Sequence, residues 1–129
     1  MKNCIFCKEI TDSHILYQTP HFKLVFDIDP IQTGHLLLIS NVHYGSITEL
    51  PISALHDLIE TQAYLVQLLE TQLPIDGVTV ASNDNYLMDD KTHFHIHLIP
   101  RRKEDGFWDT INIEPLSFSL EPFLEKLKR

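Results

Sequence analysis

Short apolar and alternating stretches predict several strands along the chain. Residues 22–28 (FKLVFDI) are rich in β-forming side chains and end at an Asp-Pro turn signal. Residues 36–40 (LLLIS) form a continuous apolar run, which is typical of a buried strand. Polar and apolar residues alternate strictly over 93–100 (HFHIHLIP), which predicts a strand with one face in the core. Shorter strands are expected at 15–18 and 78–81.

One long helix is predicted among these strands, over residues 51–73. Pro51 suits a first helical turn and Pro74 ends the helix. A second, short helix is expected at 120–128, whereas residues 103–117 show no clear period and are expected to form a loop. The pattern therefore predicts one α+β domain over residues 1–129 with a mostly antiparallel sheet. Its long helix presents a stripe of apolar side chains with a 3.6-residue period: Leu55, Leu58, Ile59, Val66, Leu69 and Leu73.

The composition is that of an ordinary soluble globular protein, with 43% apolar and 22% charged residues. No apolar run approaches the roughly 20 residues of a membrane span, and the N-terminus lacks the apolar segment of a signal peptide. We therefore expect a cytoplasmic protein without a membrane partner. The net charge of -8 argues against binding to a nucleic-acid backbone, but it does not exclude a small anionic ligand.

The chain contains eight histidines, and three of them fall at alternate positions of one predicted strand. His93, His95 and His97 would share one face of that strand, with successive side chains about 7 Å apart. A neutral imidazole can bind metal, attack an electrophile or transfer a proton near neutral pH. Three such groups on one face favour a functional site over a solvated strand face.

Cys4 and Cys7 form a Cys-x-x-Cys motif close to the N-terminus. Two thiolates can supply half of a four-coordinate zinc site, whose other two ligands histidines would provide. A redox pair and a chance spacing are the alternatives, although a redox motif would belong to a strand–helix junction.

Asp27 ends an apolar strand and lies just before a turn. Its carboxylate could accept both hydroxyl groups of a ribose. Taken from the residues alone, capping of the turn before Pro30 is the favoured interpretation.

Four segments together resemble the histidine triad (HIT) superfamily: residues 4–8 (CIFCK), 27–30 (DIDP), 34–35 (GH) and 93–101 (HFHIHLIPR). The last of them meets every position of the family signature, in which histidines and apolar residues alternate. The resemblance implies an α+β HIT-like fold with a five-stranded antiparallel sheet, one long helix and a short C-terminal helix. It also implies a homodimer.

The resemblance implies a hydrolase that cleaves at the α-phosphorus of a nucleotidyl substrate, such as a dinucleoside polyphosphate or a nucleoside phosphoramidate. His95 would be the nucleophile and His97 would contact the phosphate. A purine nucleotide such as AMP would bind, with its ribose on Asp27, so the resemblance reverses the preference for turn capping. Other residues would lie around the ligand: Ile5, Phe6 and Phe26 near the base, and His35 around the phosphate.

The resemblance also extends to a zinc-bearing branch of the superfamily. There, an N-terminal Cys-x-x-Cys pairs with a histidine after the buried strand and with the first histidine of the triad. These positions are Cys4, Cys7, His43 and His93 in this chain. Four protein ligands leave no open position for a substrate, so the implied zinc is structural.

The loop before the triad departs from the family pattern. Many members carry Gln and Ser or Thr where this chain has Asp89 and Asp90. Asn83 is the best match to a family asparagine, and Asn85 is the alternative. Carboxylates near a phosphate repel it unless they turn away or a nearby cation offsets them. This loop motivates one alternative to a hydrolase, a nucleotide-binding module with little turnover. A nucleotidyl transferase, in which a second substrate replaces water, is the last alternative, because nothing in the short chain indicates a second substrate domain. Arg101 and Arg102 either contact further phosphates or form a solvated strand end.

Overall fold

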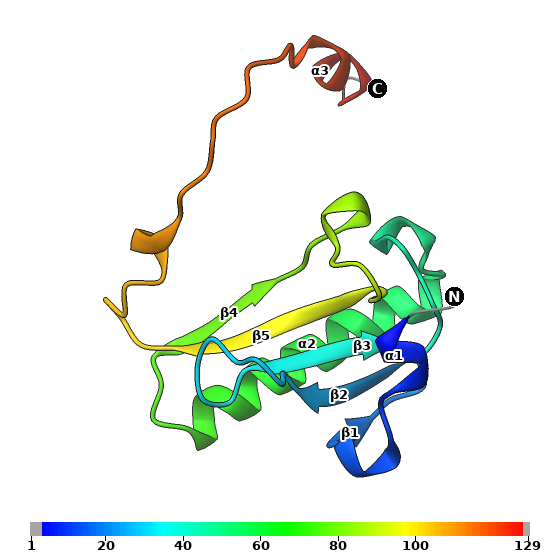
Figure 1. The fold of residues 1–129 in the computed structure, drawn as a ribbon, viewed down its shortest axis with the longest axis vertical. Helices are drawn as coiled ribbons and strands as arrows, with labels where there is room; N and C mark the ends of the chain where they lie inside the picture. The colour runs from blue at the N-terminus through cyan, green and yellow to red at the C-terminus, as the bar shows by residue number, and fades with distance from the viewer. Residues whose placement is uncertain (1–3, 128–129) are drawn as a thin grey trace.

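A computed structural model describes residues 4–127 of the chain. Five antiparallel strands form one sheet with the order β1-β2-β3-β5-β4 (Figure 1). Because β5 lies between β3 and β4, the strand that carries the histidines has a neighbour on both sides. The predicted α+β class and antiparallel sheet are confirmed. The strands are β1 (Tyr17–Gln18), β2 (Phe22–Phe26), β3 (Leu36–Ser40), β4 (Gly77–Ala81) and β5 (His95–Arg101).

The histidine strand begins two residues later than its alternating pattern predicts, so His93 precedes β5. The His93 imidazole turns toward the end of β3, where its Nε2 donates to the Ser40 carbonyl at 2.7 Å. The alternation itself is confirmed, because Phe94, Ile96 and Leu98 all lie in the hydrophobic core. His93 therefore lies outside the strand that carries His95 and His97.

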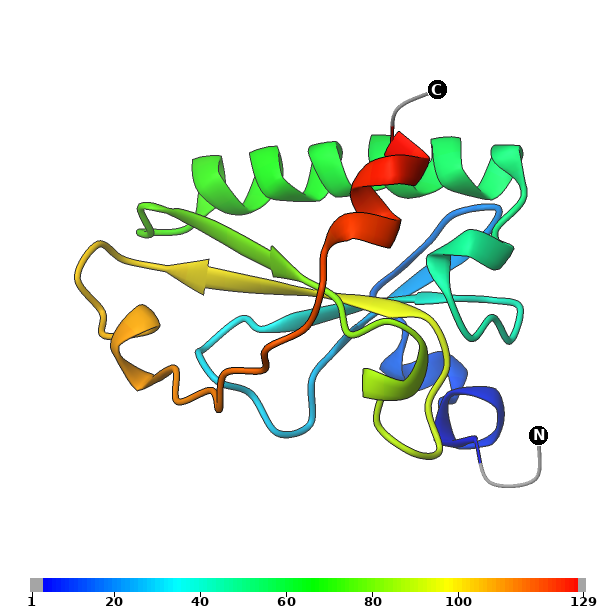
Figure 2. The same ribbon diagram turned by 90° about the horizontal axis from the view of Figure 1, so that it is seen from above.

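Helix α2 (Ile52–Gln72) covers one face of the sheet (Figure 2). Its buried side chains are Ala54, Leu58, Thr61 and Leu65, spaced three or four residues apart. Ile59, which we expected in the core, is 62% exposed. The predicted apolar stripe was rotated around the helix relative to the face that is buried. The prediction counted only large aliphatic side chains and left out Ala54 and Thr61, which are buried in the structure.

The opposite face of the sheet carries a smaller apolar cluster under the short helix α1 (Ile5–Lys8). Figure 2 shows α1 and α2 on opposite sides of the sheet. A helix of four residues leaves no periodic pattern in the sequence, so α1 was not predicted. The cluster consists of Cys4, Phe6, Val25, Leu37 and Ile39.

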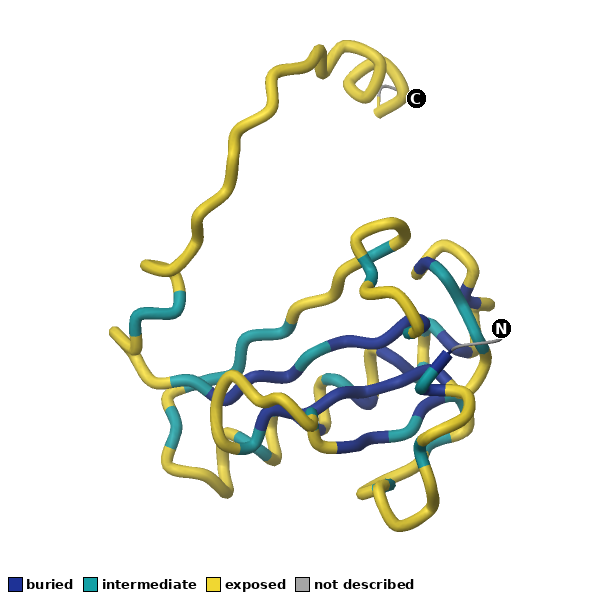
Figure 3. Tube along the Cα trace, in the orientation of Figure 1, coloured by how far each residue is buried: buried dark blue, intermediate teal, exposed yellow. Residues whose placement is uncertain are grey.

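The chain after residue 110 leaves the sheet as an extended segment that ends in α3 (Glu121–Leu127), in Figures 1 and 3. We call residues 111–127 the C-terminal arm; all of them are exposed. The predicted short helix is confirmed, although its last position, Lys128, lies outside the described residues. Within residues 4–127, no helix has the length and apolar character needed to span a membrane. Four 3₁₀ turns complete the described structure: Asp12–His14, Ile47–Glu49, Asn85–Leu87 and Trp108–Thr110.

Candidate active site

His95 lies at the start of β5, where its imidazole is buried and one ring nitrogen is hydrogen-bonded to the backbone. Its Nδ1 lies 2.7 Å from the carbonyl oxygen of His93. A carbonyl only accepts hydrogen bonds, so Nδ1 carries the proton and Nε2 keeps its lone pair. The ring is 6% exposed, and the edge of Phe6 packs against it with the ring centroids 4.9 Å apart. The local fold therefore leaves the lone pair of His95 Nε2 available.

His97 has the opposite tautomer, which a chain of hydrogen bonds from the β2–β3 loop determines. The backbone N–H of Ile31 donates to His35 Nδ1 at 3.1 Å, so His35 carries its own proton on Nε2. That Nε2–H donates to His97 Nδ1 at 2.9 Å. His97 must then carry its proton on Nε2.

The two imidazoles of β5 thus offer complementary groups side by side, with ring centroids 5.0 Å apart. His95 presents a lone pair and His97 presents an N–H donor. A lone pair can attack an electrophilic centre while the donor stabilises negative charge on an adjacent oxygen. Together they suit attack on a phosphorus atom that carries anionic oxygens.

Burial keeps these histidines neutral. It lowers the pKa of His35, His95 and His97, and in each case it outweighs the smaller opposing effect of the Asp27 carboxylate. His97 is shifted further because His95 and His35 lie beside it. Neutral imidazoles are what the two tautomers require near neutral pH.

Acid should destabilise the fold through His35 and His97. Both have a pKa below the ordinary value of 6.5 in the folded chain, so the unfolded chain binds protons more readily. We expect the free energy of unfolding to fall as the pH drops below about 6.5, and to be insensitive to these groups above it. Denaturant unfolding between pH 5.5 and 7.5 measures this, and ring ¹⁵N shifts report the tautomers. Midpoints at or above 6.5 for both rings would contradict the expectation.

Asp27 follows β2 and forms part of the same network. Its Oδ1 accepts the backbone N–H of Asp29 at 2.8 Å, and its Oδ2 lies 3.3 Å from His35 Nε2. The turn-capping contact is therefore present. A carboxylate has further lone-pair sites, so binding of a ribose by Asp27 stays a prediction.

A second cluster joins four residues from three distant parts of the chain. The donor atoms of Cys4, Cys7, His43 and His93 all lie within 4.8 Å of one another. His93 Nδ1 is 3.2 Å from Cys4 Sγ, and His43 Nδ1 is 3.3 Å from Cys7 Sγ. A tetrahedral zinc ion, with bonds of about 2.3 Å to sulfur and 2.0 Å to nitrogen, separates these ligand types by about 3.5 Å.

The protonation of His93 also suits a metal ligand. Its Nε2 donates to the Ser40 carbonyl, which leaves the Nδ1 lone pair facing the two thiols. Burial lowers the pKa of His93 to about 4, so its imidazole is neutral near pH 7. The four residues thus fit a structural zinc ion in donor type, number and spacing.

A second group of possible metal-ligand atoms lies close together on Asp27, His35 and His97. The protonation of its histidines does not suit a cation. The N–H of Ile31 occupies His35 Nδ1, so His35 Nε2 is a protonated donor without a lone pair. Hydrogen bonding explains this group without an ion.

The structure places only two of the three residues expected near the base on the same side of the sheet. Ile5 and Phe6 lie on α1, and Phe6 contacts both His93 and His95 through its ring edge. Phe26 pairs with Leu36 at the end of β2 and is 57% exposed. Alternation places Phe26 on the face that α2 covers, opposite His97.

Two residues of the site were missed in the sequence. Val25 lies in one cross-strand row with Leu37 and His97, so it shares their face of the sheet. The sequence could have indicated this, because side chains alternate between the two faces of a strand and Val25 follows Leu24. Ser82 donates its hydroxyl to the His95 carbonyl at 2.9 Å, and only the β4–β5 register, which the sequence does not reveal, places it there.

The β4–β5 loop brings a carboxylate toward the two imidazoles. Asp89 raises the pKa of both His95 and His97, although less than burial lowers it. Its backbone carbonyl accepts the Thr92 hydroxyl at 2.6 Å, which fixes the turn before the triad. Asn83 is exposed in the same loop, and its role as a substrate contact stays a prediction.

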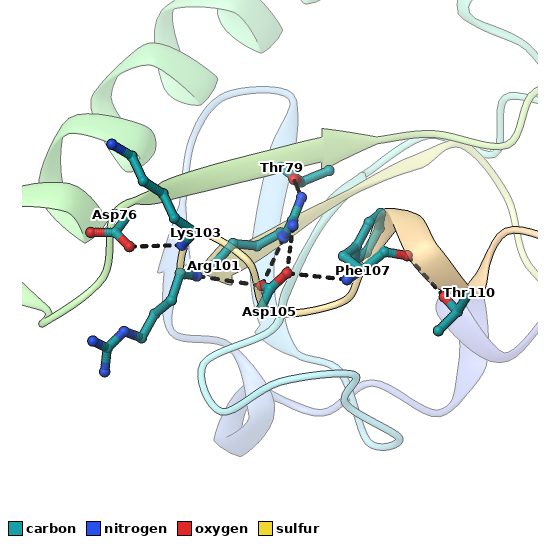
Figure 4. A network of polar contacts seen from close by, with 8 residues as sticks. Asp76, Thr79, Arg101, Lys103, Asp105, Phe107 and Thr110 are labelled. Atoms are coloured by element: carbon teal, nitrogen blue, oxygen red, sulfur yellow. Dashed lines mark hydrogen bonds and ion pairs between the residues drawn. The ribbon is translucent and has the colours of Figure 1, made fainter.

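Arg101 is held within the protein by a polar network (Figure 4). Its guanidinium donates to both carboxylate oxygens of Asp105 and, from Nη1 at 3.0 Å, to the Thr79 hydroxyl. The ring of Phe107 stacks on it, with the guanidinium carbon 4.4 Å from the ring centroid. This geometry favours a structural role for Arg101 over contacts to further phosphates.

The chain shows clear similarity to known proteins. The HIT domain family model matches residues 8–104. An uncharacterized HIT-like protein of Methanocaldococcus jannaschii is 32% identical over 107 residues, which make up 80% of this chain and 82% of the relative. The adenosine 5'-monophosphoramidase of Saccharomyces cerevisiae is 30% identical over 105 residues, which make up 78% of this chain and 64% of that enzyme.

A solved structure shares the fold. The Zn-bound histidine triad family protein from Mycobacterium smegmatis superimposes with a TM-score of 0.70 at 24% identity. The alignment covers 89% of this chain and 85% of that protein.

Proposed function

Since the chain belongs to the HIT domain family, we propose that it hydrolyses a nucleotidyl substrate at the α-phosphorus, with His95 as the nucleophile. The complementary tautomers of His95 and His97 carry this proposal. The phosphoramidase activity named for the yeast relative supports it and favours an adenosine phosphoramidate as a test substrate.

The proposed reaction has two displacements at phosphorus. His95 Nε2 forms a bond to the phosphorus, and the bond to the leaving group breaks with its electron pair on that group, which takes up a proton. Water then replaces His95 on the phosphorus and releases the nucleoside monophosphate and a proton. His97 Nε2–H stabilises negative charge on a phosphoryl oxygen in both steps.

We propose that Cys4, Cys7, His43 and His93 hold a zinc ion. Their spacing and the neutral His93 ring support this, as does the zinc named for the Mycobacterium smegmatis protein. With four protein ligands, the ion would supply rigidity rather than chemistry to the site.

We propose that Asp27 binds the ribose of the nucleoside and that Ile5 and Phe6 lie near its base. We expect Asp27→Asn to lower kcat/KM for an adenosine phosphoramidate by about 10- to 100-fold, because an amide accepts the two ribose hydroxyls less well than a carboxylate. The 2'-deoxy substrate should lose less, so the discrimination between the two sugars shrinks. Steady-state kinetics on both substrates measures it.

Asp29→Asn is the matched control, because it changes a carboxylate in the same turn whose side chain is exposed. It should leave the discrimination between the two sugars intact. If Asp27→Asn and Asp29→Asn both preserve it, Asp27 does not bind the ribose.

A nucleotide-binding module with little turnover is the second candidate function. The observation that favours it is Asp89, whose carboxylate acts on both His95 and His97 and would repel an anionic phosphate. Binding of AMP by wild-type protein that turns over neither a phosphoramidate nor a dinucleoside polyphosphate would select this function.

A further inference from the structure

The Cys-x-x-Cys segment places one accessible and one protected sulfur atom side by side. Cys7 is exposed, whereas Cys4 is 1% exposed. Both sulfur atoms face the same ring nitrogen, because His93 Nδ1 lies 3.2 Å from Cys4 Sγ and 3.5 Å from Cys7 Sγ. The sequence contains two cysteines, so Cys4 is the one thiol of the chain that can react with an oxidised Cys7.

The backbone of this segment has a shape that permits a disulfide. The N–H of Cys7 donates to the Cys4 carbonyl at 3.2 Å, which closes a turn between residues three positions apart. Such a turn brings the two Cα atoms within about 7 Å, and disulfides join Cα atoms roughly 4.4–6.8 Å apart. The two sulfur atoms can therefore bond to each other without any rearrangement of the sheet.

A disulfide and a zinc ion exclude each other at this site. Zinc binds cysteine as the thiolate, and the sulfur atoms of a disulfide are not thiolates. Oxidation of the pair would leave His43 and His93, which are two ligands where a structural zinc takes four. The oxidation state of the two cysteines therefore decides whether the cluster can hold an ion.

The helix that carries the cysteines packs against the proposed nucleophile. Phe6 stands between the two cysteines in the sequence, is 7% exposed, and has its ring centroid 4.9 Å from that of His95. The N–H of Ile5 donates to the Lys91 carbonyl at 2.7 Å, which ties the same helix to the loop before β5. Because α1 has four residues, a change in the bonding of its cysteines would move the ring that covers His95.

We propose that Cys4 and Cys7 form a redox switch, in which a hydroperoxide converts the pair to a disulfide. The disulfide removes both sulfur ligands from the proposed zinc site and displaces Phe6 from His95, so turnover falls. The switch goes beyond the proposed hydrolase and rests on it for its effect on turnover. It rests on the proposed zinc site for the release of metal.

The chemistry has two steps, written here for hydrogen peroxide. The Cys7 thiolate attacks one peroxide oxygen, the O–O bond breaks, and the leaving hydroxide takes up a proton, so Cys7 becomes a sulfenic acid. The Cys4 thiolate then attacks the Cys7 sulfur, the S–O bond breaks, and a second hydroxide takes up a proton. Two electrons pass from the thiolates to the peroxide, which is reduced to two molecules of water. A dithiol reverses the oxidation by thiol–disulfide exchange.

The test uses the full-length protein, reduced and loaded with zinc, with hydrogen peroxide as the oxidant. Mass spectrometry after alkylation of free thiols detects the disulfide, and a chromogenic chelator measures released zinc. Activity on adenosine 5'-phosphoramidate is measured after catalase removes the peroxide. We expect a disulfide in each chain, release of the bound zinc, and a fall in kcat/KM of about tenfold, because small displacements at a catalytic group slow a reaction this much. Dithiothreitol with zinc should restore all three.

Two variants and a matched control assign the effect to the pair. In Cys4→Ser, peroxide should carry Cys7 on to the sulfinic acid, which dithiothreitol does not reverse. Cys7→Ser lacks the accessible sulfur, so the same dose should leave Cys4 reduced; it keeps the proposal testable if Cys4→Ser fails to fold. Met88→Leu removes the methionine of the β4–β5 loop and should keep the disulfide, the zinc release and their reversal.

Each other outcome contradicts a defined part of the proposal. The switch is overturned if peroxide forms no disulfide, if zinc stays bound to the oxidised chain, or if both changes leave kcat/KM unaltered. A response that disappears in Met88→Leu assigns the effect to methionine and overturns it as well. Wild-type protein that turns over no nucleotidyl substrate removes the proposed function, whereas the thiol and zinc measurements still decide whether oxidation controls the metal site.

Discussion

Replacing His95 by Asn should lower turnover of an adenosine phosphoramidate by at least about 10⁴-fold, because it removes the nucleophile while a substrate can still bind. The asparagine amide can keep the hydrogen bond that His95 Nδ1 donates to the His93 carbonyl. We therefore expect AMP affinity to change by no more than a few-fold. Turnover is followed by chromatography of released AMP, and affinity by calorimetry.

A covalent intermediate gives the same prediction a second readout. Quenching wild-type protein during turnover of a labelled substrate should trap a nucleotidyl group on the chain, and His95→Asn should trap none. His56→Asn is the matched control, because His56 is an exposed histidine on α2. Turnover that survives in His95→Asn would remove His95 from the nucleophilic role, whatever the affinity for AMP.

Replacing Cys7 by Ser should release the proposed zinc and destabilise the fold. The change is nearly isosteric at an exposed position, so its effect reports the metal ligand rather than core packing. We expect bound zinc to fall from about one per chain to well below that, because a hydroxyl is a poor replacement for a thiolate. The free energy of unfolding should fall by about 4 kcal/mol, the stabilisation that a ligand supplies at about a thousandfold its dissociation constant.

Metal analysis and denaturant unfolding in zinc-buffered solution measure both quantities. A chelator should destabilise the wild-type protein to the level of Cys7→Ser and have no further effect on the variant. His43→Ala should act in the same direction, and His56→Ala, which removes an exposed histidine of α2 outside the cluster, should not. Equal zinc content in Cys7→Ser and wild type would refute the assignment.

Periodicity in the sequence predicted the sheet and the long helix because their residues repeat the same environment many times. The buried run 36–40 and the helix between Pro51 and Pro74 agree closely with β3 and α2. The error at Ile59 arose because small residues occupy the helix face that touches the sheet. Helix α1 has four residues and no period, so its place over the second face could be seen only in three dimensions.

The residue types of the candidate site could be predicted from the sequence, but the tautomers of its histidines could not. The sequence placed His95 and His97 on one face of a strand, and β5 carries both. Their tautomers depend on which backbone group faces each ring, and the N–H of Ile31 and the carbonyl of His93 have no signature in the sequence.

His93 belongs to both halves of the site. Its side chain faces the thiols of Cys4 and Cys7, while its backbone carbonyl accepts the hydrogen bond from His95 Nδ1–H that leaves the Nε2 lone pair available. An ion held by that imidazole would restrain the backbone carbonyl that is hydrogen-bonded to His95 Nδ1. Catalytic rate would then depend on metal occupancy although no metal touches the substrate, and a metal-free redesign would have to hold this one carbonyl by other means.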